Sequence, residues 1–357
     1  MARLLTCGFE TGELKEFNGG SNSTAIISTL YKRTGSYSLR LADGSGISST
    51  GYIAHTFGAD VTELYFRFAL YKDSNAIQAA SHALMTFYDN MNAAQLTLYY
   101  NTGTQGLDLY LGGAPDSSPA GTLLATGTLV LRPNIWCVVQ GRVLIDDVSG
   151  AVTVTINNTT VVAYSGDTKA TGVAGVRSVQ FRAAVGTLTG FYGYTYIDDI
   201  AVNDTTGSYE NTWPGLGGVY MLKPTADGAT ATWDTSTGTT HYTLVDDVPA
   251  NTTDWIQARD TGEIDLFELS NTPTYVNKIN LVEVLYQAAV TESGYNIMTD
   301  VLRDDGVNYT DGTATVVGIV PGYVLYKGTA YYRRPADGTT AWGTADVDAL
   351  QAGVQIV

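Results

Sequence analysis

Short runs of alternating hydrophobic and polar residues fill the first part of the chain. The clearest are ELYFRFALY (63–71), AQLTLYY (94–100), WCVVQGRVLID (136–146) and AVTVTINNTTVVAYSG (151–166). Alternation with a period of two predicts strands that bury one face. Asn157-Asn158, between two alternating halves, predicts a tight hairpin turn. Many short strands without helical patterns between them predict an antiparallel jelly-roll sandwich over residues 1–207.

The pattern breaks where polar residues, Gly and Pro cluster in NDTTGSYENTWPGLGG (203–218). Such a cluster predicts a linker, which we assign to residues 208–218. Strand patterns then resume, for example in KINLVEVLYQAAV (278–290), and RDDGV (303–307) predicts a hairpin turn. A smaller β domain is therefore expected over residues 219–357.

The C-terminal tail carries the one helix signal. Thr344 is expected to cap the helix, Asp346 to lie in its first turn and Gly353 to end it before a last strand. These residues predict a short helix near residues 345–351. The fold class expected from the whole pattern is all-β, with a jelly roll followed by a smaller β domain that contains this helix.

Composition and charge narrow the classes of partner. The net charge is −16, the pI is about 4.4 and the 19 Lys and Arg residues are dispersed. We therefore expect no binding to nucleic acid, because phosphate binding needs clustered cations. No apolar run reaches the length of a membrane span or a signal-peptide core, so membrane insertion and export are not expected. Cys7 and Cys137 are expected to be buried free thiols.

Catalytic motifs are not evident in the sequence. His55, His82 and His241 are far apart and match no zinc-binding spacing, and no GxSxG or phosphate-binding loop occurs. Glycoside hydrolysis needs two carboxyl groups that face one cleft. Glu263 and Asp265 alternate in EIDLFEL, but no third acid joins them on that face. No catalytic residue is therefore assigned, and we expect the protein not to be an enzyme.

Asp198 and Asp199, adjacent in YIDDIAV, are the most conspicuous acids. Successive strand residues point to opposite faces, so one carboxylate is expected to face solvent and the other to accept backbone hydrogen bonds. The alternative is a calcium site, completed by Glu10 of GFETG if the first and last strands pair. The sequence leaves both interpretations open and requires no other cofactor.

Tyrosines on predicted strands form the candidate glycan site. Tyr99 and Tyr100 end one strand, and Tyr192 and Tyr194 alternate in FYGYTY. Such rings can form a platform for sugar faces, although tyrosine also covers half-exposed sheet at low entropic cost. We assign these four residues to glycan binding as a hypothesis.

Several segments in order resemble a known family. They are GFETG, RTGSYSLRL (33–41), the run from Trp136 to residue 166, and YIDDIAVNDTTG (196–207). Together they resemble the concanavalin A-like, or laminin-G-like, jelly roll of structural proteins in tailed bacteriophages. In that family the first and last strands lie side by side. NTWPGLGGVYMLKPTADGATATWD and a tail with Trp342, Val347, Leu350, Gly353 and Val354 resemble the second domain that follows in the phage proteins.

The resemblance implies a non-enzymatic virion structural protein, such as a capsid decoration, head-fibre or tail-associated protein. Its expected location is the virion, after synthesis in the host cytoplasm. The expected partners are other virion proteins and host-surface glycans, and the protein is expected to be a homo-oligomer or to occur in many copies on the particle. We expect the C-terminal domain to dock through the apolar segment 316–326. The alternatives are a bacterial carbohydrate-binding module and, less favoured, a jelly-roll glycoside hydrolase.

Overall fold

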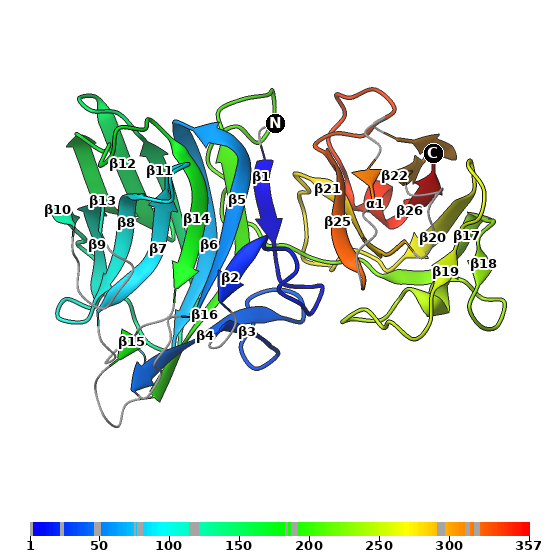
Figure 1. The fold of residues 1–357 in the computed structure, drawn as a ribbon, viewed down its shortest axis with the longest axis horizontal. Helices are drawn as coiled ribbons and strands as arrows, with labels where there is room; N and C mark the ends of the chain where they lie inside the picture. Colours follow the sequence, from blue (N-terminus) through cyan, green and yellow to red (C-terminus); the bar gives the residue numbers. More distant parts are fainter. Residues whose placement is uncertain are drawn as a thin grey trace. The chain divides into compact units, whose positions relative to one another are not determined.

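The computed structural model of the protein describes residues 3–21, 25–45, 51–74, 76, 81–113, 121–182, 185–186, 192–290, 297–310, 315–317 and 322–357. The chain divides into two compact units, Met1–Val219 and Tyr220–Val357. Both consist of β-strands, and the described residues contain one short α-helix (Figure 1). The predicted all-β class is therefore confirmed.

The first unit is a sandwich of two sheets, which contain nine and seven strands among the described residues. Sheet A has the order β13 (Thr159–Gly166), β12 (Gly150–Ile156), β11 (Cys137–Leu144), β6 (Glu63–Lys72), β16 (Tyr192–Asp204), β4 (Ser38–Ser45) and β15 (Val185–Gly186), with β1 (Arg3–Cys7) beside β16 and β3 (Ala25–Ser28) beside β4. Sheet B has the order β10 (Thr122–Thr126), β9 (Gly106–Leu111), β8 (Ala94–Asn101), β7 (His82–Tyr88), β14 (Val176–Arg182), β5 (Tyr52–Val61) and β2 (Gly19–Ser21).

The core of this unit lies between the two sheets. Alternate residues of each strand enter it, for example Phe66 and Phe68 of β6 and Val179 and Phe181 of β14. The first and last strands pair as expected, with Cys7 opposite Ile200. This pairing closes the jelly roll and brings residues near Glu10 close to residues near Asp198.

The predicted hairpin at Asn157-Asn158 is confirmed. The two residues join β12 to β13 with φ angles of 48° and 67°, the left-handed conformation that Asn tolerates. The Asn157 side chain also accepts a hydrogen bond from the backbone N–H of Val138 at 2.8 Å. A turn residue thus also satisfies a donor at the start of β11.

The second unit has a sheet that contains six strands among the described residues. Sheet C has the order β17 (Pro224–Ala231), β20 (Ile264–Leu269), β26 (Gln351–Ile356), β22 (Ile297–Asp304) and β23 (Val307–Tyr309), with β24 (Thr315–Val316) beside β22. Two further pairs are β18 (Asp234–Thr235) with β19 (Ile256–Gln257) and β21 (Val282–Ala288) with β25 (Val324–Tyr331). A 3-10 turn, η2, spans Tyr242–Leu244.

The local predictions for this unit are partly right. Asp305-Gly306 forms the hairpin turn expected within 303–307, between β22 and β23. The helix α1 spans Thr344–Asp348, but Gly343 occupies the N-cap position and donates its N–H to Asp346. Gly353 does not end the helix. It lies inside β26, where an added Cβ would come 1.8 Å from the Asp265 carbonyl oxygen.

Candidate functional site

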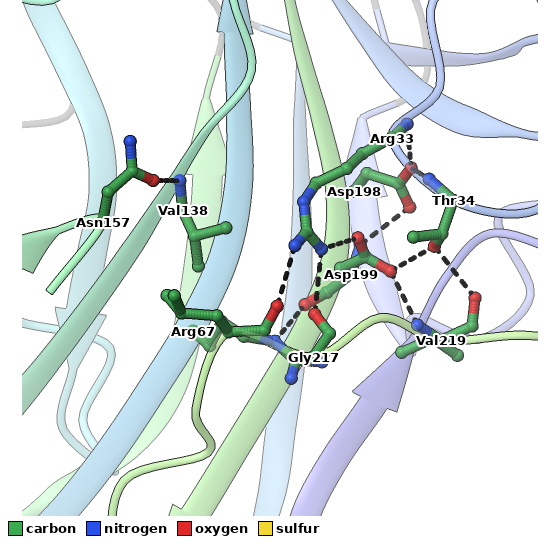
Figure 2. A network of polar contacts seen from close by, with 10 residues as sticks. Arg33, Thr34, Arg67, Val138, Asn157, Asp198, Asp199, Gly217 and Val219 are labelled. Atoms are coloured by element: carbon green, nitrogen blue, oxygen red, sulfur yellow. Dashed lines mark hydrogen bonds and ion pairs between the residues drawn. The ribbon is translucent and has the colours of Figure 1, made fainter. Parts of the chain in front are cut away.

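The three acids considered for calcium, Glu10, Asp198 and Asp199, contact one turn of the first unit, residues 33–37. The Glu10 carboxylate accepts the N–H groups of Ser36 and Tyr37 at 2.8 and 3.2 Å. Asp198 accepts the N–H groups of Arg33 and Thr34 at 2.8 and 3.3 Å (Figure 2). The structure therefore brings together three acids that are far apart in sequence.

Asp199 corrects the expectation that one of the adjacent acids faces solvent. Both side chains are fully buried. The register of β16 shifts between Asp198 and Ala201, and Asp199 has a φ of 54°. This bulge interrupts the alternation, because the extra residue lets consecutive side chains contact the same turn. Sequence alternation alone could not reveal it.

Asp199 is the centre of a network that holds the end of the first unit (Figure 2). Its carboxylate pairs with the Arg33 guanidinium at 2.6 Å and accepts the Val219 N–H at 2.7 Å. Arg33 also donates to the carbonyl oxygens of Leu216 and Gly217. Arg67 donates Nε–H to the Asp199 carbonyl oxygen at 2.9 Å, and its burial lowers the pKa of the guanidinium to about 10.

Gly35 explains part of the RTGSYSLRL motif. It has a φ of 59°, and a Cβ at this position would lie 2.2 Å from the Glu10 carboxyl group. Only glycine allows this conformation together with so close an approach. Within the described part of the chain, no group of three His, Cys, Asp or Glu side chains is arranged to hold a metal ion. Donors on the protein already occupy these carboxylates, which act here as structural acceptors.

The burial of these acids predicts a pH dependence of stability. Burial and then the neighbouring Asp199 raise the pKa of Asp198 from 3.8 to about 8, and burial raises the pKa of Glu10 from 4.5 to about 7. Both folded-state values exceed the unfolded ones. The stability that the protonated Asp198 and Glu10 side chains contribute is therefore complete below about pH 4 and is lost as the pH rises through about 7 to 8.

We expect the first unit to lose about 3 kcal/mol of unfolding free energy from Glu10 alone between about pH 5 and pH 9. Both free cysteines, Cys7 and Cys137, lie in this unit, so thiol labelling during denaturant unfolding reports on it specifically. The Glu10→Gln variant should show a smaller alkaline loss than the wild type. An equal or larger loss in this variant would contradict the assignment.

The tyrosines assigned to glycan binding lie on three different faces. Tyr100 points into the sandwich and is fully buried, and Tyr99, on the outer face of sheet B, is only 2% exposed. Neither ring presents a face to solvent. Tyr194 is half-buried on the outer face of sheet A, beneath the Arg40 guanidinium. Tyr192 belongs to β16, but its side chain lies outside the described residues.

The remaining candidates of the sequence analysis do not converge on one site. His82 lies in the first unit and is 1% exposed. Asp265, in the second unit, is fully buried and accepts the N–H groups of Thr232 and Trp233. Its other oxygen lies 2.6 Å from His241 Nδ1, a pair that sequence spacing did not suggest. Glu263 accepts a backbone N–H from the loop before it.

A different cluster lies on the outer face of sheet B. Val179 and Phe181 of β14 enter the core, so Gln180 and Arg182 point to the opposite face. Arg182 Nη2 donates to Gln180 Oε1 at 2.9 Å and to the Tyr88 hydroxyl at 3.4 Å. The guanidinium lies over the Tyr52 ring, 4.9 Å from its centroid. Strands β5, β7 and β14 are neighbours, and this adjacency assembles the cluster.

Two polar atoms of this cluster lack a hydrogen-bond partner among the described residues. They are Arg182 Nε and Thr86 Oγ1, from residues that are 7% and 0% exposed. Thr86 is the cross-strand partner of Gln180. No described carboxylate pairs with Arg182, whereas Arg177 on the same strand pairs with Asp60. A buried cation without a counter-ion is costly, and it marks a place where an anion would be stabilised.

Sequence reasoning missed this cluster, although one signal was present. SVQFRAAV alternates, and this alternation alone places Gln180 and Arg182 on the face opposite Val179 and Phe181. The positions of Tyr52 and Tyr88 depend on strand order, which the sequence did not define.

Comparison with known proteins finds distant similarities among solved structures only. No family model matches the chain, and no curated protein matches it. Among solved structures, it is similar to an endo-β-1,4-glucuronan lyase from the fungus Trichoderma reesei, with 15% identity, coverage of 54% of this chain and 93% of the other, and a TM-score of 0.42. An alginate lyase, Aly36B, has 12% identity, coverage of 57% and 98%, and a TM-score of 0.43.

A third similar structure is a carbohydrate esterase from a Shiga toxin-encoding bacteriophage, with 18% identity, coverage of 56% and 97%, and a TM-score of 0.40. All three are carbohydrate-active proteins. Their identities of 12–18% and TM-scores of 0.40–0.43 are low, so the ligand has to be argued from this chain's own residues.

The comparisons correct two predictions. The similar structures are polysaccharide lyases and a carbohydrate esterase, so the prediction of a non-enzymatic virion structural protein is wrong, and so is the prediction that the protein is not an enzyme. The docking role of segment 316–326, part of which lies outside the described residues, is not tested and stays a prediction. The expected partners, location and oligomeric state are not tested and stay predictions. The described residues form no helix long and apolar enough to cross a membrane.

Proposed function

We propose that the first unit is a carbohydrate-active domain that binds an acidic polysaccharide on the outer face of sheet B. One observation carries this proposal: Arg182 is buried, has no described counter-ion, and has an Nε–H without an acceptor. A guanidinium binds planar carboxylates well, because its N–H groups form a fixed fork. A uronic acid residue supplies such a carboxylate on a sugar ring.

The surrounding residues suit the rest of a sugar. The half-buried Tyr52 ring offers apolar surface and Gln180 offers an amide to hydroxyls, while Tyr88 and Thr86 are buried at the base of the cluster. This is the combination of a few polar groups with aromatic surface that is typical of small-ligand sites. Polyglucuronate and alginate are suitable test ligands, because they are polymers of uronic acids and are named for two of the similar enzymes.

The net charge of −16 means that the protein as a whole repels a polyanion, so the salt dependence of binding tests the contact with Arg182. Long-range repulsion between the protein and a polyanion is screened at physiological salt, whereas a partly buried contact is screened much less. We therefore expect alginate or polyglucuronate to bind more tightly at about 0.15 M salt than at about 0.01 M, and cello-oligosaccharides not to bind at this face. Isothermal titration of the full chain measures both. A neutral chain that binds as tightly as the acidic one, and whose affinity Arg182→Gln lowers to the same extent, would contradict the proposal.

A second candidate function is eliminative cleavage of the same polymer. The observation that favours it is the contact between Arg182 and the Tyr88 hydroxyl. A cation at the uronate carboxylate acidifies the C5–H, so the Tyr88 side chain in its phenolate form can take that proton and, as the phenol, give it to the leaving oxygen. The proton leaves C5, a C4–C5 double bond forms, the C4–O bond breaks, and the leaving oxygen takes up a proton.

Cleavage has a direct readout, because the unsaturated uronate absorbs ultraviolet light. We expect absorbance to rise with time when the wild-type chain is mixed with alginate or polyglucuronate. Tyr88→Phe should lower the rate of this rise by about a hundredfold. Binding without a rise in absorbance would limit the protein to the binding role. A Tyr88→Phe variant that cleaves at the wild-type rate would remove Tyr88 from the reaction.

A further inference from the structure

A group of aromatic side chains lies on the outer face of sheet A. It comprises Tyr31, Tyr71, Trp136, Tyr194 and Tyr196, here called the outer aromatic cluster. Tyr31 stacks on Tyr71 with ring centroids 4.6 Å apart and an angle of 22°, and it meets Tyr196 edge-on at 5.1 Å. Trp136 lies 5.5 Å from Tyr71, and Tyr194 lies 6.4 Å from Tyr196.

The cluster has a buried base and an exposed rim. Tyr71 of β6 and Tyr196 of β16 are cross-strand partners and are 5% and 0% exposed. Tyr31 is 39% exposed, and Trp136 and Tyr194 are half-buried. None of the five packs into the hydrophobic core between the sheets. The cluster therefore presents aromatic surface to solvent beyond what the sandwich core uses.

One buried polar group of this region is left unsatisfied among the described residues, and one half-exposed cation lies beside it without a described carboxylate. The Tyr196 hydroxyl is buried and has no hydrogen-bond partner. The Arg40 guanidinium lies 4.6 Å from the centroid of the Tyr194 ring and pairs with no described carboxylate. A buried polar atom without a partner costs free energy, so its presence beside exposed rings indicates a place where a ligand or water completes the bonding.

The charges at the rim indicate the chemical class of the ligand. Arg40 supplies one positive charge, and Asp73, whose carboxylate accepts the Tyr194 N–H at 2.8 Å, supplies one negative charge. Both act electrostatically on the Tyr196 hydroxyl. Asn134 adds an amide, whose oxygen accepts from the Tyr71 hydroxyl. A balanced rim of hydrogen-bonding groups around aromatic faces suits a ligand that is uncharged, has apolar ring faces and carries hydroxyls at its edges.

We propose that the outer aromatic cluster is a second carbohydrate site, which binds neutral hexose residues by stacking on Tyr31 and Trp136. It lies on the sheet opposite to the Arg182 cluster, so a single protein can hold two stretches of glycan. This inference does not rest on the acidic-polysaccharide proposal. Occupation of both sites by one polymer would raise the overall avidity if both are reached at once.

The test uses a printed array of neutral oligosaccharides, followed by isothermal titration with each glycan that the full-length wild type retains. We expect at least one neutral glycan to bind. Tyr31→Ala and Trp136→Ala should each weaken its binding about two- to twelvefold, because an aromatic stacking contact contributes about 0.5–1.5 kcal/mol. Arg182→Gln should leave this affinity unchanged, which separates the two sites.

Tyr275→Ala is the matched control, because Tyr275 is an exposed ring (69%) of the second unit. Thiol labelling of Cys7 confirms that each variant is folded. Absence of binding to every neutral glycan on the array would overturn the proposal, and so would binding that Tyr31→Ala and Trp136→Ala leave unchanged. Self-association of the wild type that Tyr31→Ala abolishes, without glycan binding, would instead assign the cluster to contacts between copies.

Discussion

Replacing Asp199 with Ala is expected to destabilise the first unit by about 3 kcal/mol or more. The change removes a fully buried carboxylate that pairs with Arg33 and accepts from Thr34 and Val219. It leaves those donors without their acceptor, which costs more than the hydrogen bonds themselves contributed. Alanine at a φ of 54° adds backbone strain of about 1 kcal/mol.

Denaturant unfolding followed by labelling of Cys7 and Cys137 measures this loss in the first unit. Asp199→Asn should be milder, because Asn tolerates the left-handed conformation and keeps one acceptor oxygen. Asp147→Ala is the matched control: Asp147 also pairs with a cation, Lys169, but its side chain is 64% exposed. We expect the control to change stability by less than about 0.5 kcal/mol. A similar midpoint for Asp199→Ala and Asp147→Ala would contradict the structural role of the network.

Replacing Arg182 with Gln is expected to weaken binding of an acidic polysaccharide about ten- to hundredfold. A hydrogen bond to a charged group contributes about 1.5–3 kcal/mol, and Gln retains the polar contacts but not the charge. Arg182→Lys keeps the charge without the planar fork, so its affinity should fall between the wild type and Arg182→Gln. Isothermal titration with alginate and polyglucuronate gives the affinities.

Arg177→Gln provides the control for this experiment, because Arg177 lies on the same strand but already pairs with Asp60. It should bind the polymer as the wild type does. Arg182 is buried, so the folded state of each variant is checked by thiol labelling before titration. A folded Arg182→Gln variant that keeps its affinity for alginate and polyglucuronate would remove Arg182 from the site.

The sequence predicted the features that depend on local pattern. Alternation identified the strands, Asn157-Asn158 identified a hairpin, and the pairing of the chain's first and last strands followed from the resemblance. It failed at Asp199, because a bulge with a positive φ at a residue other than glycine leaves no trace in the alternation. The same alternation had been used to separate Asp198 from Asp199, and the structure places both around one turn.

The candidate site depended on information that no local pattern contains. Tyr52, Tyr88 and Arg182 are separated along the chain and meet only because β5 and β7 flank β14. The absence of a described counter-ion for Arg182 is likewise a property of the folded chain. Tyr99 and Tyr100 were assigned to a glycan-binding surface from the local pattern alone, and the fold buries both side chains.

The most direct test of the central claim is a thermodynamic cycle between Arg182 and the ligand carboxylate. The ligands are polyglucuronate and the same polymer after chemical reduction of its carboxyl groups, each titrated into the wild type and into Arg182→Gln. If Arg182 binds the carboxylate, reduction and mutation should each weaken binding, and their effects should not add, with a coupling of about 1–3 kcal/mol. Additive effects, with a coupling near zero, would show that the carboxylate is bound elsewhere and would contradict the proposed site.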